Sequence, residues 1–456
     1  MSFKKNFGVV GAIVALMSDF REYFKGKKVT LMGLGLLGRG VGDAVFLAEC
    51  GANVIVTDKK GDAELAQSVE KLKKYPNITF HLGGHRMEDF TEIDLVIKAA
   101  GGPLDSPEIA AARKTGMQVA MSTALFAKFA REAGAKIVGV TGTRGKSTVT
   151  QMIAHSLIRA NKPIVLGGNV RGVSTLAKLS EVSPRTVVVL ELDSWQLQGF
   201  GDLQISPNVA VFTNLMPDHQ NYYPDMDAYF ADKQNIFKFQ KEGDALVVGK
   251  QVFERVQAAR PPQEAVVPPM IPDDWKLNVL GEHNRENASL AAGALRVLGL
   301  SEEEIRSGLE SFQPVEGRLQ FVREIGSVKI YNDNNATTPE ATIAALKALG
   351  ENIALICGGS EKGLDLKELV AEIKKRASSV IVLAHPNYKG SERLMDELRT
   401  ADIAFDTAAN LPDAAAKGMK MAKETLLFSP AFASFGMFQN EYDRNDQFIR
   451  LIKNLR

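Results

Sequence analysis

Short apolar runs of strand length alternate with longer amphipathic stretches along most of the chain, which is the pattern of strands separated by helices. In its first part the pattern predicts strands at residues 27–35, 52–58, 77–83, 93–102 and 117–122. It continues with strands at 136–142, 163–169, 186–192, 209–214 and 244–249, and then at 327–333, 352–359, 379–385 and 425–430. Strands that alternate with helices form parallel sheets covered by helices on both faces.

The pattern divides into three α/β units. We predict these domains at residues 1–124, 125–314 and 315–456. A proline-rich segment at 259–275 is predicted to be a surface connection, and a helical region at about 283–312 closes the second domain. Clefts between α/β domains favour small-molecule sites.

The composition excludes some partners. The 456 residues carry a net charge of +1, so no overall field draws in nucleic acid or an anionic membrane. Two cysteines, Cys50 and Cys357, are too few for a disulfide framework and are typical of a reducing cytoplasm. The apolar run at 7–17 is shorter than the roughly 20 residues that span a bilayer, so we expect a leading helix there, with a signal peptide as the alternative. We expect a monomeric cytoplasmic protein with no membrane span and no nucleic-acid partner.

A glycine-rich loop at 142–148 has the context of a phosphate-binding loop but a shortened form. Gly145-Lys146-Ser147 is present, whereas Val140 stands where the usual motif has its first glycine. A predicted strand precedes the loop and a helix pattern follows it, so backbone N–H groups and a helix N-terminus would face an anion. In such a loop the lysine reaches the β- and γ-phosphates, and the hydroxyl of Ser147 holds Mg²⁺. The alternative is a glycine turn with an exposed lysine.

A second glycine motif follows the first predicted strand. Gly33, Gly35 and Gly38 form G-x-G-x-x-G, and Asp58 ends the next strand, which is the fingerprint of a dinucleotide-binding turn. Such a turn holds a diphosphate and its nucleoside but does not by itself indicate hydride transfer. The alternative is a tight turn needed only for packing.

The two motifs together define a narrower class of enzyme. A nicotinamide-dependent oxidoreductase explains only the motif at 33–38, whereas an enzyme that uses ATP on a nucleotide-linked substrate explains both. Glu191, His219 and Lys233 follow in the central domain, and a carboxylate beside a phosphate loop can bind Mg²⁺ directly or through water. Each residue also has an ordinary interpretation when it is considered alone: His219 as a hydrogen-bonded loop residue and Lys233 as a solvated charge on a helix.

The motifs, taken in order, resemble those of the Mur ligases over nearly the whole chain. In the central domain they are Thr-Gly-Thr-x-Gly-Lys-Ser-Thr at 141–148, Gly-Gly-Asn at 167–169, Glu-Leu-x-Ser-x-Gln-Leu at 191–197, Asp-His at 218–219, Lys233 and Gly-x-His-Asn-x-x-Asn at 281–287. In the third domain they are Arg318, Asn-Asp-x-x-Ala-Thr at 332–337, Gly-Gly-x-x-Lys-Gly at 358–363 and Ser-Pro-Ala-x-Ala-Ser at 429–434. The resemblance implies Rossmann-like first and third domains around a P-loop-type central ATPase domain, and the short phosphate loop is the form that this family has.

The resemblance also implies an activity, an ATP-dependent ligation in cytoplasmic peptidoglycan precursor synthesis. The first domain, with its G-x-G-x-x-G and Asp58, is most similar to members that join D-glutamate to UDP-N-acetylmuramoyl-L-alanine. In that reaction the substrate carboxylate attacks the γ-phosphate of ATP, and the amino group of D-glutamate then displaces phosphate from the acyl phosphate. The chemistry requires neutralised charge, aligned reactants and exclusion of water.

Carried onto this sequence residue by residue, the resemblance implies four sets of site residues. The catalytic residues are Lys146, Glu191, His219 and Lys233, and the ligands of two Mg²⁺ ions are Ser147, Glu191, His219 and Lys233. Lys233 would act as a carbamate formed with CO₂, which needs the neutral amine that burial favours. The ATP-binding residues are Gly142, Thr143, Arg144, Gly145, Lys146, Ser147, Thr148, Asn284, Asn287, Arg318 and Asp333. The substrate-binding residues are Leu34, Gly35, Asp58, Lys59, Gly101, Gly102, Asn169, Gln196 and His219 for the UDP-linked acid, and Thr337, Lys362, Ser434 and Phe435 for D-glutamate.

Several positions differ from the family pattern. Asn334-Asn335 stand where Ser-Lys is usual, Asp193 replaces a serine, and Glu441 falls where an aromatic residue often contacts the amino acid. An acidic group near a dicarboxylate is unfavourable, so the identity of the amino acid stays open. The alternatives are another Mur-type ligase that adds a different amino acid, a folylpolyglutamate-synthase-like enzyme, and a non-catalytic nucleotide-binding homologue. The complete set of catalytic residues argues against the last.

Overall fold

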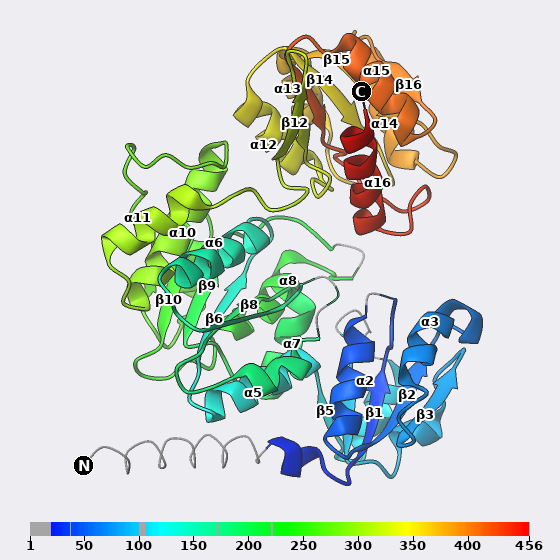
Figure 1. Cartoon of the computed structure of the whole chain (residues 1–456), viewed down its shortest axis with the longest axis vertical. Coiled ribbons are helices and arrows are strands. Elements are labelled where there is room, and N and C mark those ends of the chain that lie inside the picture. Colours follow the sequence, from blue (N-terminus) through cyan, green and yellow to red (C-terminus); the bar gives the residue numbers. More distant parts are fainter. Residues whose placement is uncertain are drawn as a thin grey trace. The chain divides into compact units, whose positions relative to one another are not determined.

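The computed structural model describes residues 20–36, 38–99, 106–170, 172, 174–219 and 222–455. The chain forms two compact units, one of Met1–Ile271 with Asn287–Leu309 and one of Pro272–Glu286 with Glu310–Arg456. Three sheets, each accompanied by helices, are found in the described residues (Figure 1). Of the predicted features, the apolar run at 7–17 and the residues Gly101 and Gly102 lie outside the described part. In that part no helix combines the length and the apolar character needed to cross a membrane.

The first sheet is parallel, with the strand order β3-β2-β1-β4-β5. Its strands are β1 (Lys28–Met32), β2 (Asn53–Asp58), β3 (Ile78–Leu82), β4 (Leu95–Lys98) and β5 (Gln118–Ala120). The accompanying helices are α2 (Arg39–Glu49), α3 (Asp62–Leu72), η1 (Met87–Phe90) and α4 (Pro107–Lys114). The chain reverses its direction across the sheet between β1 and β4, and ligands of such sheets bind at the carboxyl ends of the strands at this point. The glycine motif at 33–38 begins there, directly after β1.

The central sheet is also parallel, with the order β11-β10-β9-β6-β8-β7. Its strands are β6 (Lys136–Thr141), β7 (Ile164–Gly168), β8 (Val187–Glu191), β9 (Val209–Phe212), β10 (Ala245–Val248) and β11 (Ala265–Val266). The helices are α5 (Ser122–Glu132), α6 (Lys146–Arg159), η2 (Leu176–Glu181), α7 (Ser194–Asp202), α8 (Met226–Lys233), η3 (Gln234–Ile236), α9 (Phe253–Ala258), α10 (Glu282–Val297) and α11 (Glu302–Ser311). Because β6 lies between β8 and β9, the loop that follows β6 is flanked by the ends of both neighbours.

The third sheet has the order β12-β13-β17-β14-β15-β16, and only its edge strand β12 runs antiparallel to its neighbour in the described residues. Its strands are β12 (Gln320–Ile325), β13 (Val328–Asn332), β14 (Ile353–Cys357), β15 (Ala377–Leu383), β16 (Asp406–Ala408) and β17 (Thr425–Phe428). The helices are α12 (Pro339–Leu349), α13 (Lys367–Arg376), α14 (Lys389–Thr400), α15 (Leu411–Met421) and α16 (Glu441–Asn454). The three motifs of this unit directly follow the adjacent strands β13, β14 and β17, so they meet at one edge of the sheet.

The predicted α/β class with three parallel-sheet domains is confirmed. The apolar runs that predicted strands in the described residues all contain one, and the helical region at 283–312 is two helices, α10 and α11. Three strands were not predicted. They are β11, which lies inside the proline-rich segment, and β12 and β16. The domain limits at 124 and 314 stay predictions.

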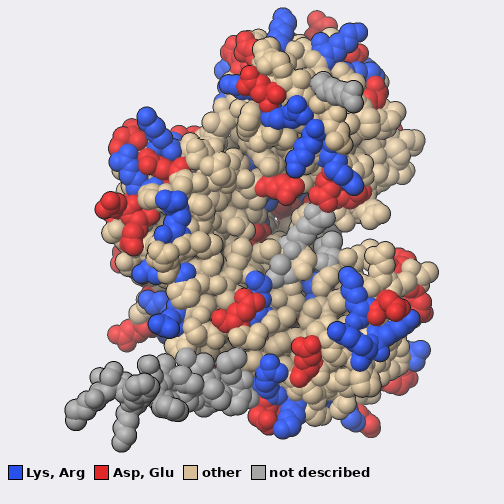
Figure 2. Space-filling model, in the orientation of Figure 1, with Lys and Arg blue, Asp and Glu red and all other residues tan. Residues whose placement is uncertain are grey.

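Charges of both signs are mixed over the surface. Lys and Arg alternate with Asp and Glu over the described residues on the face drawn in Figure 2. Several form exposed ion pairs, such as Lys25 with Glu22 at 3.1 Å and Arg399 with Asp396 at 2.6 Å. Exposed pairs of this kind each contribute about 0–1 kcal/mol, so the apolar core supplies most of the stability.

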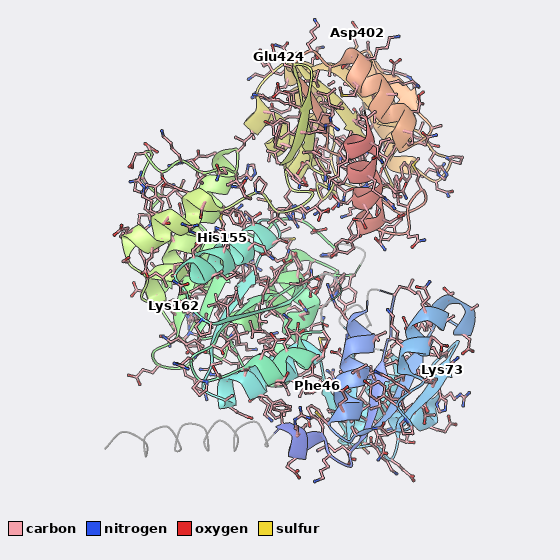
Figure 3. The ribbon with its side chains drawn as sticks, viewed as in Figure 1. Phe46, Lys73, His155, Lys162, Asp402 and Glu424 are labelled. Carbon is pink, nitrogen blue, oxygen red and sulfur yellow. The ribbon has the colours of Figure 1, made fainter. Side chains whose placement is uncertain are left out.

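One continuous apolar core joins the first two sheets. It contains residues of the first sheet such as Val54 and of the central sheet such as Leu190. Aromatic rings fill the part nearest α2, the helix that carries Phe46 (labelled in Figure 3). Phe24 contacts Phe46 and Phe129, with both centroid distances at 5.8 Å. Buried aromatic contacts of this kind favour a fixed packing arrangement. The first two sheets therefore belong to the same compact unit.

Candidate active site

The loop at 142–148, called the phosphate loop below, connects β6 to α6 and has no room for side chains at its glycines. Gly145 has a left-handed backbone with φ of 82° and directly precedes α6. A Cβ atom at Gly145 would lie 2.3 Å from Oδ1 of Asn287, and one at Gly142 would lie 1.9 Å from Oγ1 of Thr213. Both positions therefore require glycine. The N-terminus of α6 opens onto the loop, which is how phosphate is bound at helix N-termini.

The segment that follows β9 holds the phosphate loop in place. The N–H of Thr143 donates to the carbonyl of Asn214 at 2.9 Å, and the N–H of Arg144 donates to Oδ1 of the same asparagine at 2.9 Å. The hydroxyl of Thr213 donates to the carbonyl of Arg144 at 2.5 Å, and the N–H of Met216 donates to the hydroxyl of Thr143 at 2.9 Å. The sequence motifs gave no signal for Thr213 and Asn214, although they fix the loop that would bind ATP.

Two lysines converge on the phosphate loop. Nζ of Lys146 donates to the carbonyls of Gly142 at 3.1 Å and Thr143 at 3.0 Å. Nζ of Lys233 donates to the same carbonyl of Gly142 at 2.8 Å, and to the hydroxyl of Thr141 at 3.3 Å. The side chain of Lys233 is 1% exposed, and burial, followed by the charge of Lys146, holds its pKa well below the ordinary value for a lysine. Both effects favour the neutral amine over the ammonium, and the neutral amine is the form that reacts with CO₂.

Glu191 is brought to the same loop by strand pairing. It is the last residue of β8, and it pairs with Val140 of β6 on one side and with Gly168 of β7 on the other. Glu191 is 7% exposed, and Nδ2 of Asn169 lies 3.5 Å from its Oε1. The carboxylate therefore lies at the carboxyl end of the sheet, next to the phosphate loop.

His219 follows β9 with a strained backbone. Its φ is 55°, which is uncommon for a residue other than glycine and marks positions held by their surroundings. Its ring packs on Trp195 at a centroid distance of 4.7 Å and on Tyr229 at 6.1 Å. The neighbouring Asp218 pairs with Nη1 of Arg144 in the phosphate loop at 3.1 Å. The structure thus brings His219, Arg144 and the phosphate loop together.

The protein groups fit a magnesium ion that is completed by phosphate. No group of three or more His, Cys, Asp or Glu side chains suited to a metal occurs in the described part of the chain. Mg²⁺ in nucleotide sites keeps several waters and takes one or two carboxylates together with substrate phosphates. One carboxylate at Glu191 and the hydroxyl of Ser147 in the first turn of α6 match that requirement.

The first glycine loop, which begins after β1, is closed by Asp58. One carboxylate oxygen accepts the N–H of Gly35 at 2.9 Å, and the other accepts the N–H of Lys60 at 2.9 Å. Leu34 is buried in the apolar core, so only its backbone could contact a ligand, whereas Lys59 is exposed. The structure therefore gives Asp58 a role in shaping the loop, which the sequence motif did not require.

Two of the residues predicted to bind the UDP-linked acid, Gln196 and Asn169, already have protein partners in the structure. Gln196 forms a capping box with Asp193 at the start of α7, and its Nε2 donates to the hydroxyl of Thr123 at 3.1 Å. Asn169 lies between α2 and Glu191 and contacts both. The capping box also explains a departure from the family pattern, because Asp and Ser are comparably good helix N-caps.

In the second unit, Asp333 follows β13 and anchors the turn after it. Its Oδ1 accepts the N–H of Leu319 at 2.9 Å, and its Oδ2 accepts the hydroxyl of Ser429 at 2.8 Å. Burial raises the pKa of Asp333 to about 7, although these hydrogen bonds and the charge of Arg318 oppose the shift. Asn284, in the first turn of α10, donates to the carbonyl of Leu280 at 2.7 Å.

The raised pKa of Asp333 gives a testable pH dependence. A carboxyl group whose folded pKa lies above its unfolded value of about 4 binds more protons when folded, so stability falls as the pH rises from about 4 to about 7. Asp333→Asn should remove this contribution, so that the melting temperature of the variant falls less over this range than that of the wild type. Thermal unfolding of both proteins at several pH values measures the difference. Parallel pH profiles would show that Asp333 is already ionised across that range.

The residues predicted to bind the amino acid lie on three loops, which follow β13, β14 and β17 and contact one another. Nζ of Lys362 donates to the hydroxyl of Thr337 at 3.4 Å. Ser360 and Ala433 form an isolated antiparallel bridge that joins the loop after β14 to the loop after β17. Ser434 is buried, whereas Phe435 is 62% exposed. A lysine and hydroxyl groups on adjoining loops are suited to binding carboxylates.

Sequence reasoning missed two buried residues that hold these loops. Arg444 of α16 is 0% exposed, and its guanidinium donates to Oδ1 and to the carbonyl of Asn334, each at 2.8 Å. The hydroxyl of Tyr388 donates to the carbonyl of Ser434 at 3.2 Å. An arginine in an amphipathic helix gives no sequence signal that it is buried. Glu441 is the first residue of α16, where an acidic side chain favourably interacts with the helix dipole.

Family models cover most of the chain. The Mur ligase MurD-like N-terminal domain matches residues 27–121, the Mur ligase middle domain matches 140–268, and the Mur ligase glutamate ligase domain matches 317–432. A phosphate loop beside a buried lysine and a carboxylate, set in three such domains, defines an ATP-dependent amide-bond-forming ligase, and the chain belongs to the Mur ligase family. Within that family it is a MurD-like ligase of peptidoglycan synthesis.

Relatives support this assignment, and solved structures support the fold. The UDP-N-acetylmuramoylalanine–D-glutamate ligase of Roseiflexus sp. (strain RS-1) is 33% identical, over 94% of this chain and 99% of that protein. The ligase of the same name from Acidobacterium capsulatum is 31% identical, over 94% and 96%. The structure of UDP-N-acetylmuramate-alanine ligase MurC from Thermotoga maritima has a TM-score of 0.62 at 20% identity, over 94% and 99%. E. coli FolC in complex with ADP has a TM-score of 0.54 at 19% identity, over 73% and 94%. At these identities the two structures support the fold alone.

Proposed function

We propose that this enzyme joins D-glutamate to UDP-N-acetylmuramoyl-L-alanine at the expense of ATP, in the cytoplasm. The observation that carries the proposal is the similarity to ligases of that name, which reaches 33% identity over 94% of the chain. The free, buried cysteines Cys50 and Cys357 are consistent with a reducing compartment. The limits of the three domains and the monomeric state are part of the same proposal.

The first chemical step belongs to the phosphate loop. The N-terminus of α6 and the Lys146 ammonium would stabilise the charge that develops as the acid's carboxylate approaches the γ-phosphate of ATP. Asn287, whose side chain lies against Gly145, would border the nucleotide. Asn284, Arg318 and Asp333 are proposed to complete ATP binding. The first glycine loop, shaped by Asp58 and followed by the exposed Lys59, would bind the UDP group.

Two Mg²⁺ ions are proposed cofactors. Glu191, His219, the Ser147 hydroxyl and a carbamate on Lys233 would hold them, and when bound they would neutralise phosphate charge. The chain's own contribution is the buried Lys233 amine, which is held 2.8 Å from the Gly142 carbonyl and therefore faces the phosphate loop. Carbamylation would convert this amine into an anion at a fixed position.

The second step is attack by the amino group on the acyl phosphate. Thr337, Lys362, Ser434 and the exposed Phe435 are proposed to bind D-glutamate. Lys362 and Thr337 are within hydrogen-bonding distance of each other, so both could contact one carboxylate. The Lys362 ammonium would then pair with the side-chain carboxylate of D-glutamate, a group that an amino acid with a neutral side chain lacks.

A panel of amino acids tests the proposal. With ATP, Mg²⁺ and UDP-N-acetylmuramoyl-L-alanine present, phosphate release should require D-glutamate, and L-glutamate, glycine or L-alanine should give at most a few per cent of that rate. A coupled phosphate assay measures the release. Release with a different amino acid would move the enzyme to another Mur-type reaction, as the departures at Asn335 and Glu441 allow. ATP binding without turnover under any combination would favour a non-catalytic homologue.

A further inference from the structure

A chain of polar side chains connects the first glycine loop to the carboxylate beside the phosphate loop. Arg39 is the first residue of α2 and follows Gly38, which has a left-handed backbone with φ of 84°. Its Nη2 donates to Oδ1 of Asn169 at 3.0 Å, and its Nε donates to the carbonyl of Val170 at 3.0 Å. Nδ2 of Asn169 in turn faces Oε1 of Glu191 at 3.5 Å. The guanidinium of Arg39, the amide of Asn169 and the carboxylate of Glu191 thus form a continuous chain from the first glycine loop to the phosphate loop.

The chemistry of the groups fixes the orientation of the amide. A guanidinium has donors only, so the asparagine atom that faces Arg39 must be its carbonyl oxygen. The NH₂ group of Asn169 is then directed at Glu191, where it can donate to a carboxylate. The backbone reinforces this arrangement, because the N–H of Asn169 donates to the carbonyl of Glu191 at 2.7 Å. Without the guanidinium, the side-chain amide could rotate and turn its oxygen toward the carboxylate.

Contacts between α2 and the segment that contains Ser174 and Thr175 hold Arg39 in place. Asp43, one turn further along α2, is buried and accepts the hydroxyl of Ser174 at 2.6 Å. A Cβ atom at Gly42 would lie 2.5 Å from Cβ of Ser174, so α2 is in close contact with the segment that contains Ser174 and Thr175. The hydroxyl of Thr175 accepts the N–H of Gly168 at 2.8 Å, which ties the segment to the end of β7. Arg39 therefore reaches Asn169 from a rigid support.

We propose that Arg39 is a positioning residue, which acts through Asn169 to orient the Glu191 carboxylate for the metal–nucleotide complex. The inference rests on the metal role of Glu191 in the proposed function. It links the helix that begins at the UDP-binding motif with the metal-binding side of the phosphate loop. Groups that orient a metal-binding side chain typically affect metal affinity by about 10- to 100-fold when they are removed.

The test compares nucleotide affinity with and without the metal. Isothermal titration calorimetry gives the Kd of the non-hydrolysable analogue AMP-PNP in the absence and presence of Mg²⁺. The Kd without Mg²⁺ divided by the Kd with Mg²⁺ measures how much the metal strengthens nucleotide binding. In Arg39→Met this ratio should fall by about tenfold, while the metal-free Kd stays at the wild-type value. Arg39→Lys should recover part of the ratio, since its ammonium can still donate to Oδ1. Arg399→Met, which removes an exposed ion pair with Asp396 and a cation–π contact with Phe405, is the matched control and should leave the ratio unchanged.

A double-mutant cycle separates positioning from a general structural role. If Arg39 acts through Asn169, then Arg39→Met combined with Asn169→Ala should lower the ratio no further than Asn169→Ala alone. An unchanged ratio in Arg39→Met, or effects of the two substitutions that add, would overturn the proposal. If Arg39→Met fails to fold, Arg39→Lys carries the same comparison. Neither the UDP-linked acid nor an amino acid is present, so a different amino-acid specificity would leave this result intact.

Discussion

Replacement of Lys233 by alanine should lower kcat by about 10²- to 10³-fold or more while the fold is retained. The Lys233 amine donates to the carbonyl of Gly142 in the phosphate loop, and its residue is 1% exposed. Burial and the nearby Lys146 charge keep its pKa well below the ordinary value, which favours the neutral amine that reacts with CO₂. The variant loses the anion that carbamylation would place beside the loop.

Small carboxylates should partly replace that anion. Acetate or formate added to Lys233→Ala should raise its turnover, because the cavity left by the side chain adjoins the phosphate loop and an acid of this size supplies the missing charge. Steady-state phosphate release with and without each acid measures the recovery. Lys238→Ala, which removes an exposed lysine just after η3, is the control and should behave as the wild type. Full activity of Lys233→Ala without any added acid would remove Lys233 from the mechanism.

Lys146→Ala should lower kcat by a similar factor of about 10²–10³, but no small carboxylate should restore it. Its ammonium is held by the carbonyls of Gly142 and Thr143, which place it at the phosphate loop. The missing group is a cation that stabilises charge on the transferred phosphoryl group, so turnover should fall more than the affinity for the UDP-linked acid.

The control for this variant lies just beyond the same helix. Lys162 is exposed and follows α6 (Figure 3), so Lys162→Ala should retain wild-type kcat and KM. Circular dichroism and melting temperature should show that Lys146→Ala is folded. Normal turnover of that variant would contradict the assignment of the loop at 142–148 as the ATP site.

The fold could be predicted where strands are buried on both faces. The predicted strands at 186–192 and 352–359 contain continuous apolar runs, at 187–190 and 353–357, because helices cover both sides of a parallel sheet. The edge strand β12 (Gln320–Ile325) mixes polar and apolar residues, and its burial depends on a partner strand, β13, so its pattern is weak. β11 and β16 have only two and three residues, which is too short for any periodicity to be read.

Only those residues of the candidate site that belong to sequence motifs could be predicted. The order of strand, glycine, Gly-Lys-Ser and helix identifies the phosphate loop because each part has a local sequence signature. The residues that hold the motifs in place have none. Thr213 and Asn214 anchor the loop from the segment after β9. Arg39 and Arg444 are polar helix residues whose contacts come from distant segments. Their roles depend on tertiary contacts between segments that are far apart in sequence.

The central claim is that the carboxylate of the UDP-linked acid is phosphorylated by ATP held at the loop 142–148. The most direct measurement uses UDP-N-acetylmuramoyl-L-alanine labelled with ¹⁸O in that carboxylate, with mass spectrometry of the phosphate released in the presence of D-glutamate. The attacking carboxylate oxygen leaves with phosphate when the amide forms, so each phosphate should contain one labelled oxygen. Phosphate without label, recovered together with amide product, would contradict the acyl-phosphate route and the arrangement of the two nucleotide motifs on which it rests.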